Sequence, residues 1–367
     1  MIEGKVADFG IVKAAPAQYL IKEGIIKDIG HFAAGFGARA LVSGGSHALA
    51  ALDDVFFHSL EENGMQWQVN RFSGESSEAN IFTLIKKAQE FNAAMIIGAG
   101  GGKSLDTAKI AASELKIPII TVPTIAATCS AVTPLGIIYN EEGVYQRDYY
   151  PARNPNLVLV DTAIILKAPV KYLHSGILDA LAKWYEGGAS ISGAKNADMF
   201  DSIALQLAKT LAETMFQKAE AAVQSVKNQT MTESLIDVVN LNIYLAGLIQ
   251  SLGVKAVRNG VAHSVHNGLT VLQESHRLLH GLKVGCGIAV QLVLLGRAQQ
   301  EIDATLSFFK RIDFKPTFTA LNLPFDSASV LKVARKTVAD PLMRREPFDH
   351  ITADMVAAAI KRIEEIA

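Results

Sequence analysis

The stretch AMIIGAGGGKSLDTAK, residues 94–109, decides the expected fold of this 367-residue chain. Its apolar first part predicts a buried strand, and residues 103–115 have helical periodicity. The turn between them holds three consecutive glycines, Gly100, Gly101 and Gly102. Side-chain-free residues let the backbone approach a pyrophosphate, which exposed N–H groups and the helix dipole favour. A strand before and a helix after are the context that such a turn requires, so we expect phosphate or dinucleotide binding.

Two charged residues follow on the same predicted helix. Asp106 and Lys109 are three residues apart, so one interpretation is a simple ion pair on the helix surface. The alternative is that they order the loop or that Asp106 contacts the nicotinamide side of a dinucleotide.

Short strands alternate with helices on either side of this turn. We expect strands at 40–43, 66–72, 94–98, 117–122 and 157–160, helices at 76–91 and 103–115, and a hairpin of 137–140 with 144–149. This alternation predicts a parallel sheet covered on both faces. Later helices are expected at 173–192, 197–217, 231–252, 261–273, 283–301, 327–340 and 352–366. We therefore predict an α/β domain over residues 1–162 and an all-helical domain over residues 163–367.

The composition excludes several classes of protein. Half of the chain is hydrophobic and the net charge is −1, which suits a compact enzyme with a large core. There is no basic stripe to hold a nucleic acid. We see no apolar run of transmembrane length and no secretory signal, so we expect no membrane partner and a cytoplasmic protein. Two cysteines, Cys129 and Cys286, are too few for a disulfide framework.

A cluster of histidines marks residues 262–286, which contain His263, His266, His276 and His280. Neutral imidazole is the commonest transition-metal ligand. His263 and His266 are three residues apart, so both can face one side of a helix. A histidine on an apolar helix is also often an ordinary core or interface residue, so the cluster alone leaves both interpretations open.

The end of the predicted strand at 40–43 bears on the choice of dinucleotide. A dinucleotide fold that prefers NAD usually ends a strand with an acid for the ribose 2′-OH. Here the strand is followed by Gly44, Gly45 and Ser46, and no acid occurs before Asp53. The space and the hydroxyl favour a 2′-phosphate, so we expect NADP rather than NAD.

Five segments, in the right order, resemble the iron-containing (group III) alcohol dehydrogenase superfamily, and in particular its glycerol dehydrogenase-like branch. They are GGGKSLDTAK at 100–109, VPTIA at 122–126, GILDALA at 176–182, HSVHNGLT at 263–270 and HGLKV at 280–284. The resemblance implies a dinucleotide-binding α/β domain joined to a helical domain, and a divalent metal such as Zn, Fe, Mn or Ni. It also implies a small alcohol or carbonyl substrate and a homo-oligomer, either a dimer or an octamer.

The same resemblance implies roles for individual residues. The metal ligands would be Asp179, His263 and His280, a set that leaves positions open for a substrate oxygen. The metal would lower the pKa of the alcohol so that hydride can leave to nicotinamide. His266 would either lie by the substrate and relay its proton, or support the site structurally. Besides Gly102, the implied cofactor contacts are Lys103, Thr124, Thr133, Leu135 and Tyr139.

Two positions depart from the family pattern. Glycerol dehydrogenases carry an Asp that helps to hold the polyol where this chain has Cys129, which we interpret as a small buried hydrophobe. Many relatives carry a metal-binding His where this chain has Lys183, four residues after Asp179. Lys183 either pairs with a nearby acid, weakens the metal site or receives a substrate carboxylate. The last alternative predicts a 2-oxo or 2-hydroxy acid substrate and resembles a hydroxycarboxylate dehydrogenase-like offshoot.

Two other functions share this expected architecture. One is a dehydroquinate synthase-like lyase, which would need more basic residues to grip a phosphorylated acid. The other is a non-catalytic NAD(P)-binding protein. The motifs favour a metal-dependent NAD(P) oxidoreductase over both.

Overall fold

The computed structural model describes residues 12–192, 198–253 and 260–367, which form two compact units. Unit 1 contains the described residues up to 169 together with 228–231, and unit 2 contains the others. The division lies at 169/170 instead of the expected 162/163, because helix α5 (Thr162–Lys167) packs on the sheet through Ile164. Gln229 Nε2 donates to the carbonyl of Leu166 at 2.9 Å, which joins the short second segment to unit 1.

Unit 1 is built on a six-stranded sheet with the order β1-β8-β5-β4-β2-β3. Its strands are β1 (Tyr19–Lys22), β2 (Arg39–Gly44), β3 (Gln66–Arg71), β4 (Met95–Gly100), β5 (Ile119–Pro123) and β8 (Leu157–Asp161). Every pairing is parallel, so the predicted parallel sheet is confirmed. The predicted hairpin is confirmed as β6 (Gly136–Tyr139) with β7 (Tyr145–Tyr149). Strand β1 was not predicted because it is short and only partly buried at the sheet edge.

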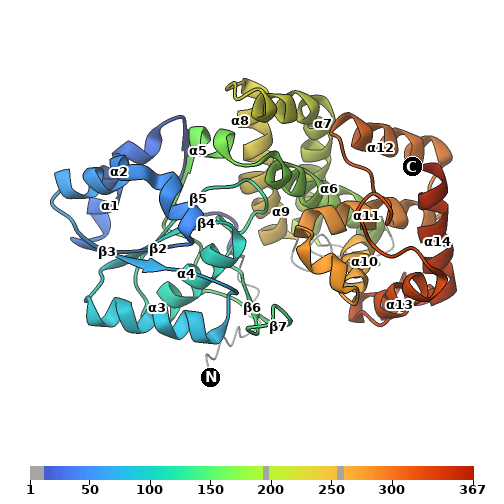
Figure 1. Cartoon of the computed structure of the whole chain (residues 1–367), viewed down its shortest axis with the longest axis horizontal. Helices are drawn as coiled ribbons and strands as arrows, with labels where there is room; N and C mark the ends of the chain where they lie inside the picture. The colour runs from blue at the N-terminus through green and yellow to red at the C-terminus, as the bar shows by residue number, and fades with distance from the viewer. Residues whose placement is uncertain (1–11, 193–197, 254–259) are drawn as a thin grey trace. The chain divides into compact units, whose positions relative to one another are not determined.

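Helices cover both faces of the sheet, as predicted. Successive side chains of a strand point to opposite faces. In β2, Ala40 and Val42 pack against α1 (Ile29–Ala33) and α2 (Ser46–Glu62), while Leu41 packs against α3 (Glu78–Glu90) and α4 (Gly102–Leu115) (Figure 1). Helix α2 was not predicted, and its helical backbone is interrupted at Asp53 (φ 59°). Two 3₁₀ turns, Ile25–Asp28 and Ala34–Phe36, flank α1.

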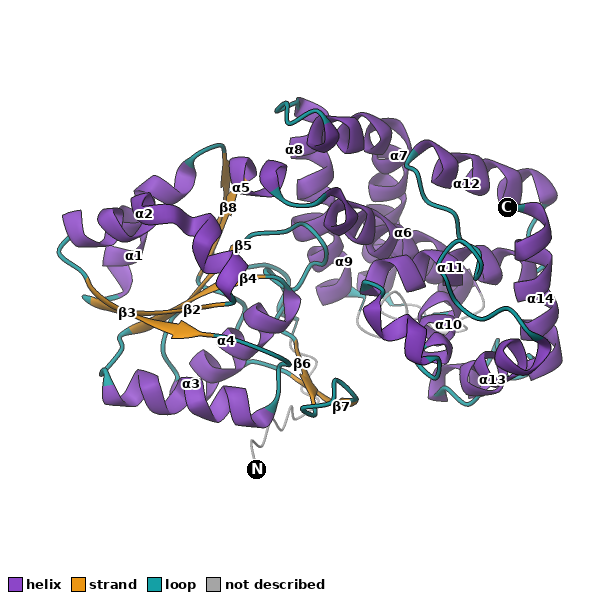
Figure 2. Ribbon diagram, in the orientation of Figure 1, coloured by secondary structure: helices purple, strands orange, loops and turns teal. Residues whose placement is uncertain are grey.

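Unit 2 contains helices and no strand in its described residues (Figure 2). The α-helices are α6 (Val170–Ser192), α7 (Met199–Lys227), α8 (Glu233–Asn240), α9 (Ala246–Leu252), α10 (Val261–Leu269), α11 (His280–Leu294), α12 (Gln299–Arg311), α13 (Ser327–Val338) and α14 (Ala353–Ile366). A π-helical turn η3 (Leu241–Leu245) and 3₁₀ turns η4 (Gln273–Arg277) and η5 (Pro341–Arg344) complete it. The helix expected at 283–301 is confirmed as α11, but its predicted end is wrong: α11 ends at Leu294, shortly before Gly296 (φ 61°), and α12 begins at Gln299.

One segment corrects the expectation that no apolar run reaches transmembrane length. The continuous helical stretch Glu233–Leu252 is long and apolar enough to cross a membrane by length and composition. Leu235, Val238 and Ile249 on this stretch have no exposed surface in the protein. Such burial is typical of a core helix, which passes the same test of composition.

Glycines let three helices of unit 2 approach closely. A Cβ on Gly281 of α11 would lie 1.8 Å from the carbonyl oxygen of Ser175 on α6. A Cβ on Gly287 would lie 2.2 Å from the carbonyl oxygen of Ala262 on α10. Both distances are far below van der Waals contact, so only glycine fits at these crossings. The close approach brings the adjacent histidines, His263 and His280, toward each other.

Candidate functional site

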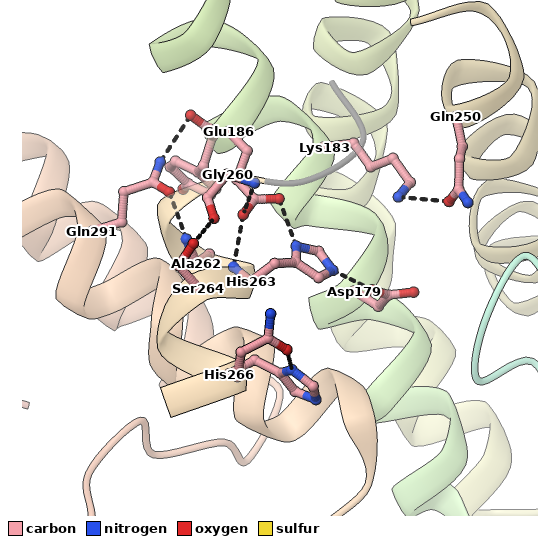
Figure 3. A network of polar contacts seen from close by, with 12 residues as sticks. Asp179, Lys183, Glu186, Gln250, Gly260, Ala262, His263, Ser264, His266 and Gln291 are labelled. Carbon is pink, nitrogen blue, oxygen red and sulfur yellow. Dashed lines mark hydrogen bonds and ion pairs between the residues drawn. The ribbon is translucent and has the colours of Figure 1, made fainter. Parts of the chain in front are cut away.

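Three side chains from three helices of unit 2 converge on one point. Asp179 Oδ1 on α6 lies 3.5 Å from Nε2 of His263 on α10 and 3.2 Å from Nε2 of His280 at the start of α11. Figure 3 shows Asp179 and His263 facing each other. One potential ligand atom from each residue lies within 4.8 Å of the others. These are the three residues that the family resemblance implied as metal ligands.

Glu186 orients His263. Its Oε2 lies 2.7 Å from His263 Nδ1, and its Oε1 accepts from the backbone N–H groups of His263 and Gly260 (Figure 3). An ionised carboxylate can only accept, so Nδ1 carries a proton, and Nε2 faces Asp179. Glu186 was not among the predicted site residues. Its position seven residues after Asp179, on the same face of α6, is the signal that indicates it.

The electrostatics of these residues favour a bound positive charge. Burial acts to raise the pKa of Asp179, but the His280 and His263 imidazoles outweigh it and hold the pKa well below its usual value. Burial acts to lower the pKa of His263, but the carboxylates of Glu186 and Asp179 outweigh it and raise the pKa to about 9. The donor set therefore fits a proton or a divalent metal ion between the three side chains.

His266 lies beside His280, with its two ring nitrogens occupied inside the protein. Its Nε2 lies 3.1 Å from His280 Nδ1, and its Nδ1 lies 3.0 Å from Asn267 Oδ1. Burial, together with the neighbouring His280 and Lys283 side chains, holds the pKa of His266 well below its usual value. Of the two roles predicted for His266, this geometry favours structural support of the site over proton relay.

Lys183 is buried on α6, one turn after Asp179, and is only 2% exposed. Its Nζ donates to Oε1 of Gln250 on α9 at 3.2 Å (Figure 3). Within the described residues it forms no ion pair with Asp179, although its charge contributes to the low pKa of Asp179. A buried ammonium with a neutral amide as its described hydrogen-bond partner is suited to receive an anion.

In unit 1, the predicted phosphate-binding residues lie along the carboxyl edge of the sheet. Strands β2 and β4 are neighbours, with Gly44 opposite Ala99, so the turns that follow them lie side by side. The chain order reverses between these two strands, since β3 lies beyond β2 and β5 lies beyond β4. Ligands of open α/β sheets bind at such a switch point. The residues gathered there are Gly44, Gly45, Ser46, Gly100, Gly101, Gly102, Lys103 and Thr124.

The glycine-rich turn after β4 has the shape that a phosphate cradle requires. Gly100 has a φ of 131°, in the region that favours glycine. A Cβ on Gly101 would lie 2.7 Å from Ile125 Cδ1, so a side chain there would require the Ile125 side chain to move. The N–H of Thr124 donates to the carbonyl of Gly100 at 3.1 Å and fixes the turn against the end of β5. The residues present therefore fit a dinucleotide pyrophosphate.

The pair of Asp106 and Lys109 is buried in the protein, so the interpretation that placed it on the helix surface is wrong. Lys109 Nζ lies 3.0 Å from Asp106 Oδ1 and also donates to three backbone carbonyls, those of Ser130, Thr133 and Leu135. Asp106 Oδ2 accepts from the N–H of Ile137 at 3.1 Å. The pair thus orders the segment 130–137, whereas its predicted role in ordering the glycine-rich loop stays a prediction. Contact of Asp106 with a cofactor stays a prediction.

The remaining predicted residues of unit 1, and one that was not predicted, are placed as follows. Lys103 pairs with Glu75, and Tyr139 donates its N–H to the carbonyl of Ser76, so both lie against the loop that follows β3. Cys129 is buried, as predicted for a small hydrophobe. Arg71, which the sequence analysis missed, ends β3 directly opposite Gly44 and is exposed.

Comparison with known proteins identifies the class. Residues 16–162 match the family described as iron-containing alcohol dehydrogenase. The chain is 34% identical over 358 residues to the glycolaldehyde reductase of Halobacterium salinarum, and this covers 96% of each protein. The chain belongs to the iron-containing alcohol dehydrogenase family. It is accordingly an oxidoreductase that acts on CH–OH groups, so neither the lyase nor the non-catalytic alternative is supported.

Two further relatives show which enzymes of the family the chain is similar to. The chain is 36% identical over 300 residues to hydroxycarboxylate dehydrogenase A of Escherichia coli, which covers 80% of this chain and 81% of that protein. The solved structure of glycerol dehydrogenase from Schizosaccharomyces pombe is 29% identical, with a TM-score of 0.85, and the match covers 96% of this chain and 90% of the other. The chain is therefore similar to both glycerol and hydroxycarboxylate dehydrogenases.

Proposed function

We propose that the protein is a metal- and NAD(P)-dependent oxidoreductase that interconverts a small 2-oxo acid and its 2-hydroxy acid. The observation that carries this proposal is the buried ammonium of Lys183, one turn along α6 from Asp179. A substrate carboxylate would give this ammonium a charged partner and so a strong hydrogen bond. The similarity to hydroxycarboxylate dehydrogenase A supports the same substrate class.

The residues of unit 2 would hold both the metal and the substrate. Asp179, His263 and His280 suit one divalent ion, and Zn, Fe, Mn and Ni all accept such a donor set. When bound, the metal supplies a positive charge that polarises the substrate oxygen, and the dinucleotide supplies or accepts the hydride. Lys183 would hold the carboxylate and thereby orient the neighbouring carbonyl group. Reduction adds one hydride to the carbonyl carbon and one proton to its oxygen.

The residues of unit 1 would hold the dinucleotide, and we propose a preference for NADP. The turn after β2 consists of Gly44, Gly45 and Ser46, which leave room for a 2′-phosphate and offer it a hydroxyl group. It has no acid of the kind that binds the ribose 2′-OH of NAD. Arg71 adds a positive charge opposite Gly44 at the end of the adjacent strand. An arginine at this place suits a ribose 2′-phosphate, which it binds by two parallel hydrogen bonds.

The variant Arg71→Ala tests the cofactor preference. We expect the KM for NADPH to rise about tenfold, equivalent to about 1.4 kcal/mol, because a charged contact to the 2′-phosphate is lost. The KM for NADH should change less than about twofold. Lys22→Ala, which removes an exposed base at the end of β1 on the same sheet edge, is the matched control. An equal rise in both KM values for Arg71→Ala would contradict the assignment.

The substrate class is tested by NADPH and NADH oxidation with the metal-reconstituted protein. We expect 2-oxobutyrate to be reduced faster than dihydroxyacetone, and NADPH to be the better donor. Reduction of dihydroxyacetone without turnover of the oxo acid would overturn the proposal. That outcome would establish the second candidate, a glycerol dehydrogenase, which the similarity to the Pseudomonas putida enzyme favours (33% identity over 332 residues, 89% of each protein).

A small-molecule substrate follows from membership of the family. We also propose a cytoplasmic location and assembly into a homo-oligomer, either a dimer or an octamer, both of which stay predictions from the family resemblance.

A further inference from the structure

We propose that Asp340 and Asn267 are positioning residues that act through His266 to fix the tautomer of His280 and present its Nε2 to the metal. The inference rests on the metal site of the proposed function. It adds residues that do not face the metal position but reach His280 through His266. It starts from an unbroken chain of hydrogen bonds. Asp340 Oδ2 lies 2.8 Å from Asn267 Nδ2, Asn267 Oδ1 lies 3.0 Å from His266 Nδ1, and His266 Nε2 lies 3.1 Å from His280 Nδ1.

The carboxylate at the end of this chain dictates the direction of every bond in it. An ionised carboxylate only accepts, so Asn267 must turn its NH₂ group to Asp340 and its oxygen to His266. That oxygen also only accepts, so the proton of neutral His266 is on Nδ1, and its Nε2 is an acceptor. His280 must therefore donate from Nδ1, which leaves the lone pair on its Nε2. This nitrogen is the one that lies 3.2 Å from Asp179 Oδ1.

The backbone holds Asp340 in the required place. Its Oδ1 accepts from the N–H of Leu342 at 3.0 Å and caps η5, so only Oδ2 is directed at Asn267. Helix α10, which carries Asn267, also lies unusually close to α13. A Cβ on Gly268 would come within 2.1 Å of Thr337 Oγ1. The two ends of the Asp340–Asn267 bond are thus fixed by packing.

Each of the two histidine ligands needs a hydrogen-bond acceptor at Nδ1 if its Nε2 is to bind the metal. His263 has a direct carboxylate partner, Glu186, at Nδ1. The side chain of His280 is 40% exposed, so burial does not select its tautomer. With no acceptor at Nδ1, the tautomer with its proton on Nε2 would be available, and that tautomer cannot bind a metal through Nε2, the nitrogen that faces Asp179. The series of hydrogen bonds that ends at Asp340 supplies this acceptor, which is Nε2 of His266.

The isosteric variant Asp340→Asn is the sharpest test. Asparagine remains a good cap for η5, but its NH₂ group can donate to Asn267. The Asn267 side-chain amide would then turn over and donate to His266. As a result, the proton of His266 and the proton of His280 would each move to the other ring nitrogen, Nε2. Competition titration of the full-length apo-protein with Zn²⁺ against a chelator should show affinity lowered about 10- to 100-fold. The melting temperature of the apo-protein should not change, whereas the rise in melting temperature on adding Zn²⁺ should shrink.

A matched control and a second variant separate the possible outcomes. Asp326→Asn changes a carboxylate that caps α13 and does not contact the histidines, so its Zn²⁺ affinity should equal that of the original protein. Asn267→Ala removes the middle of the hydrogen-bond series at an exposed helical position. If Asp340→Asn fails to fold, the Zn²⁺ affinity of Asn267→Ala tests the inference instead. Unchanged Zn²⁺ affinity in Asn267→Ala or in folded Asp340→Asn would overturn this inference alone. Absence of Zn²⁺ binding by the unmodified protein would overturn the proposed metal site itself.

Discussion

Asp179→Asn is expected to lower kcat/KM for the carbonyl substrate about a thousandfold and to abolish stoichiometric metal binding. A neutral amide replaces the one anionic donor that faces His263 and His280. The charge of a bound metal contributes several kcal/mol to such a reaction, and about 1.4 kcal/mol corresponds to a factor of ten. Steady-state kinetics and the metal content of the purified variant measure the two effects.

The matched control is Asp201→Asn, which changes an acid in the first turn of α7 and should leave both quantities unaffected. Activity of Asp179→Asn within tenfold of the original protein, insensitive to added chelator, would contradict a role for Asp179 in holding a catalytic metal.

Lys183→Met is expected to reduce kcat/KM for 2-oxobutyrate about a thousandfold while leaving dihydroxyacetone reduction nearly unchanged. The substitution keeps the length of the side chain and removes its charge. Loss of one partner from a buried ion pair typically costs about 2–5 kcal/mol, of which about 4 corresponds to that factor. Without substrate the variant should be at least as stable as the original protein, since the ammonium is buried against the neutral amide of Gln250.

The comparison of two substrates in this experiment distinguishes specificity from structural damage. An equal loss on the oxo acid and on dihydroxyacetone would assign Lys183 to the integrity of the site. Unchanged kinetics on both would remove its proposed contact with a carboxylate. Lys209→Met, on the exposed face of α7, is the control for loss of a lysine charge.

Local patterns in the sequence predict the sheet, and the family resemblance implies the three proposed metal ligands. Strands such as β4 are continuous apolar runs that end in glycines, and their alternation with helices leaves few topologies. Asp179, His263 and His280 were implied together by motifs that span more than a hundred residues, and the structure brings them together. The misses in the fold have local causes, since β1 is short and α2 is kinked at Asp53.

What the sequence could not supply is the partner of each polar group. Gln250 meets Lys183 across 67 positions, and Asp340 meets Asn267 across 73. Such contacts depend on how α9 and the turn before η5 pack, which no periodicity encodes. The pair of Asp106 and Lys109 shows the same limit. A spacing of three residues predicts that two charges meet, but only the fold reveals that they lie in the core.

Anomalous diffraction at the zinc edge, from crystals of the zinc-loaded protein, decides whether Asp179, His263 and His280 hold a single catalytic metal. We expect one strong peak per chain, about 2.0–2.2 Å from Nε2 of both histidines and from a carboxylate oxygen of Asp179. A zinc peak bound elsewhere in the chain, with these three side chains in contact only with one another, would contradict it.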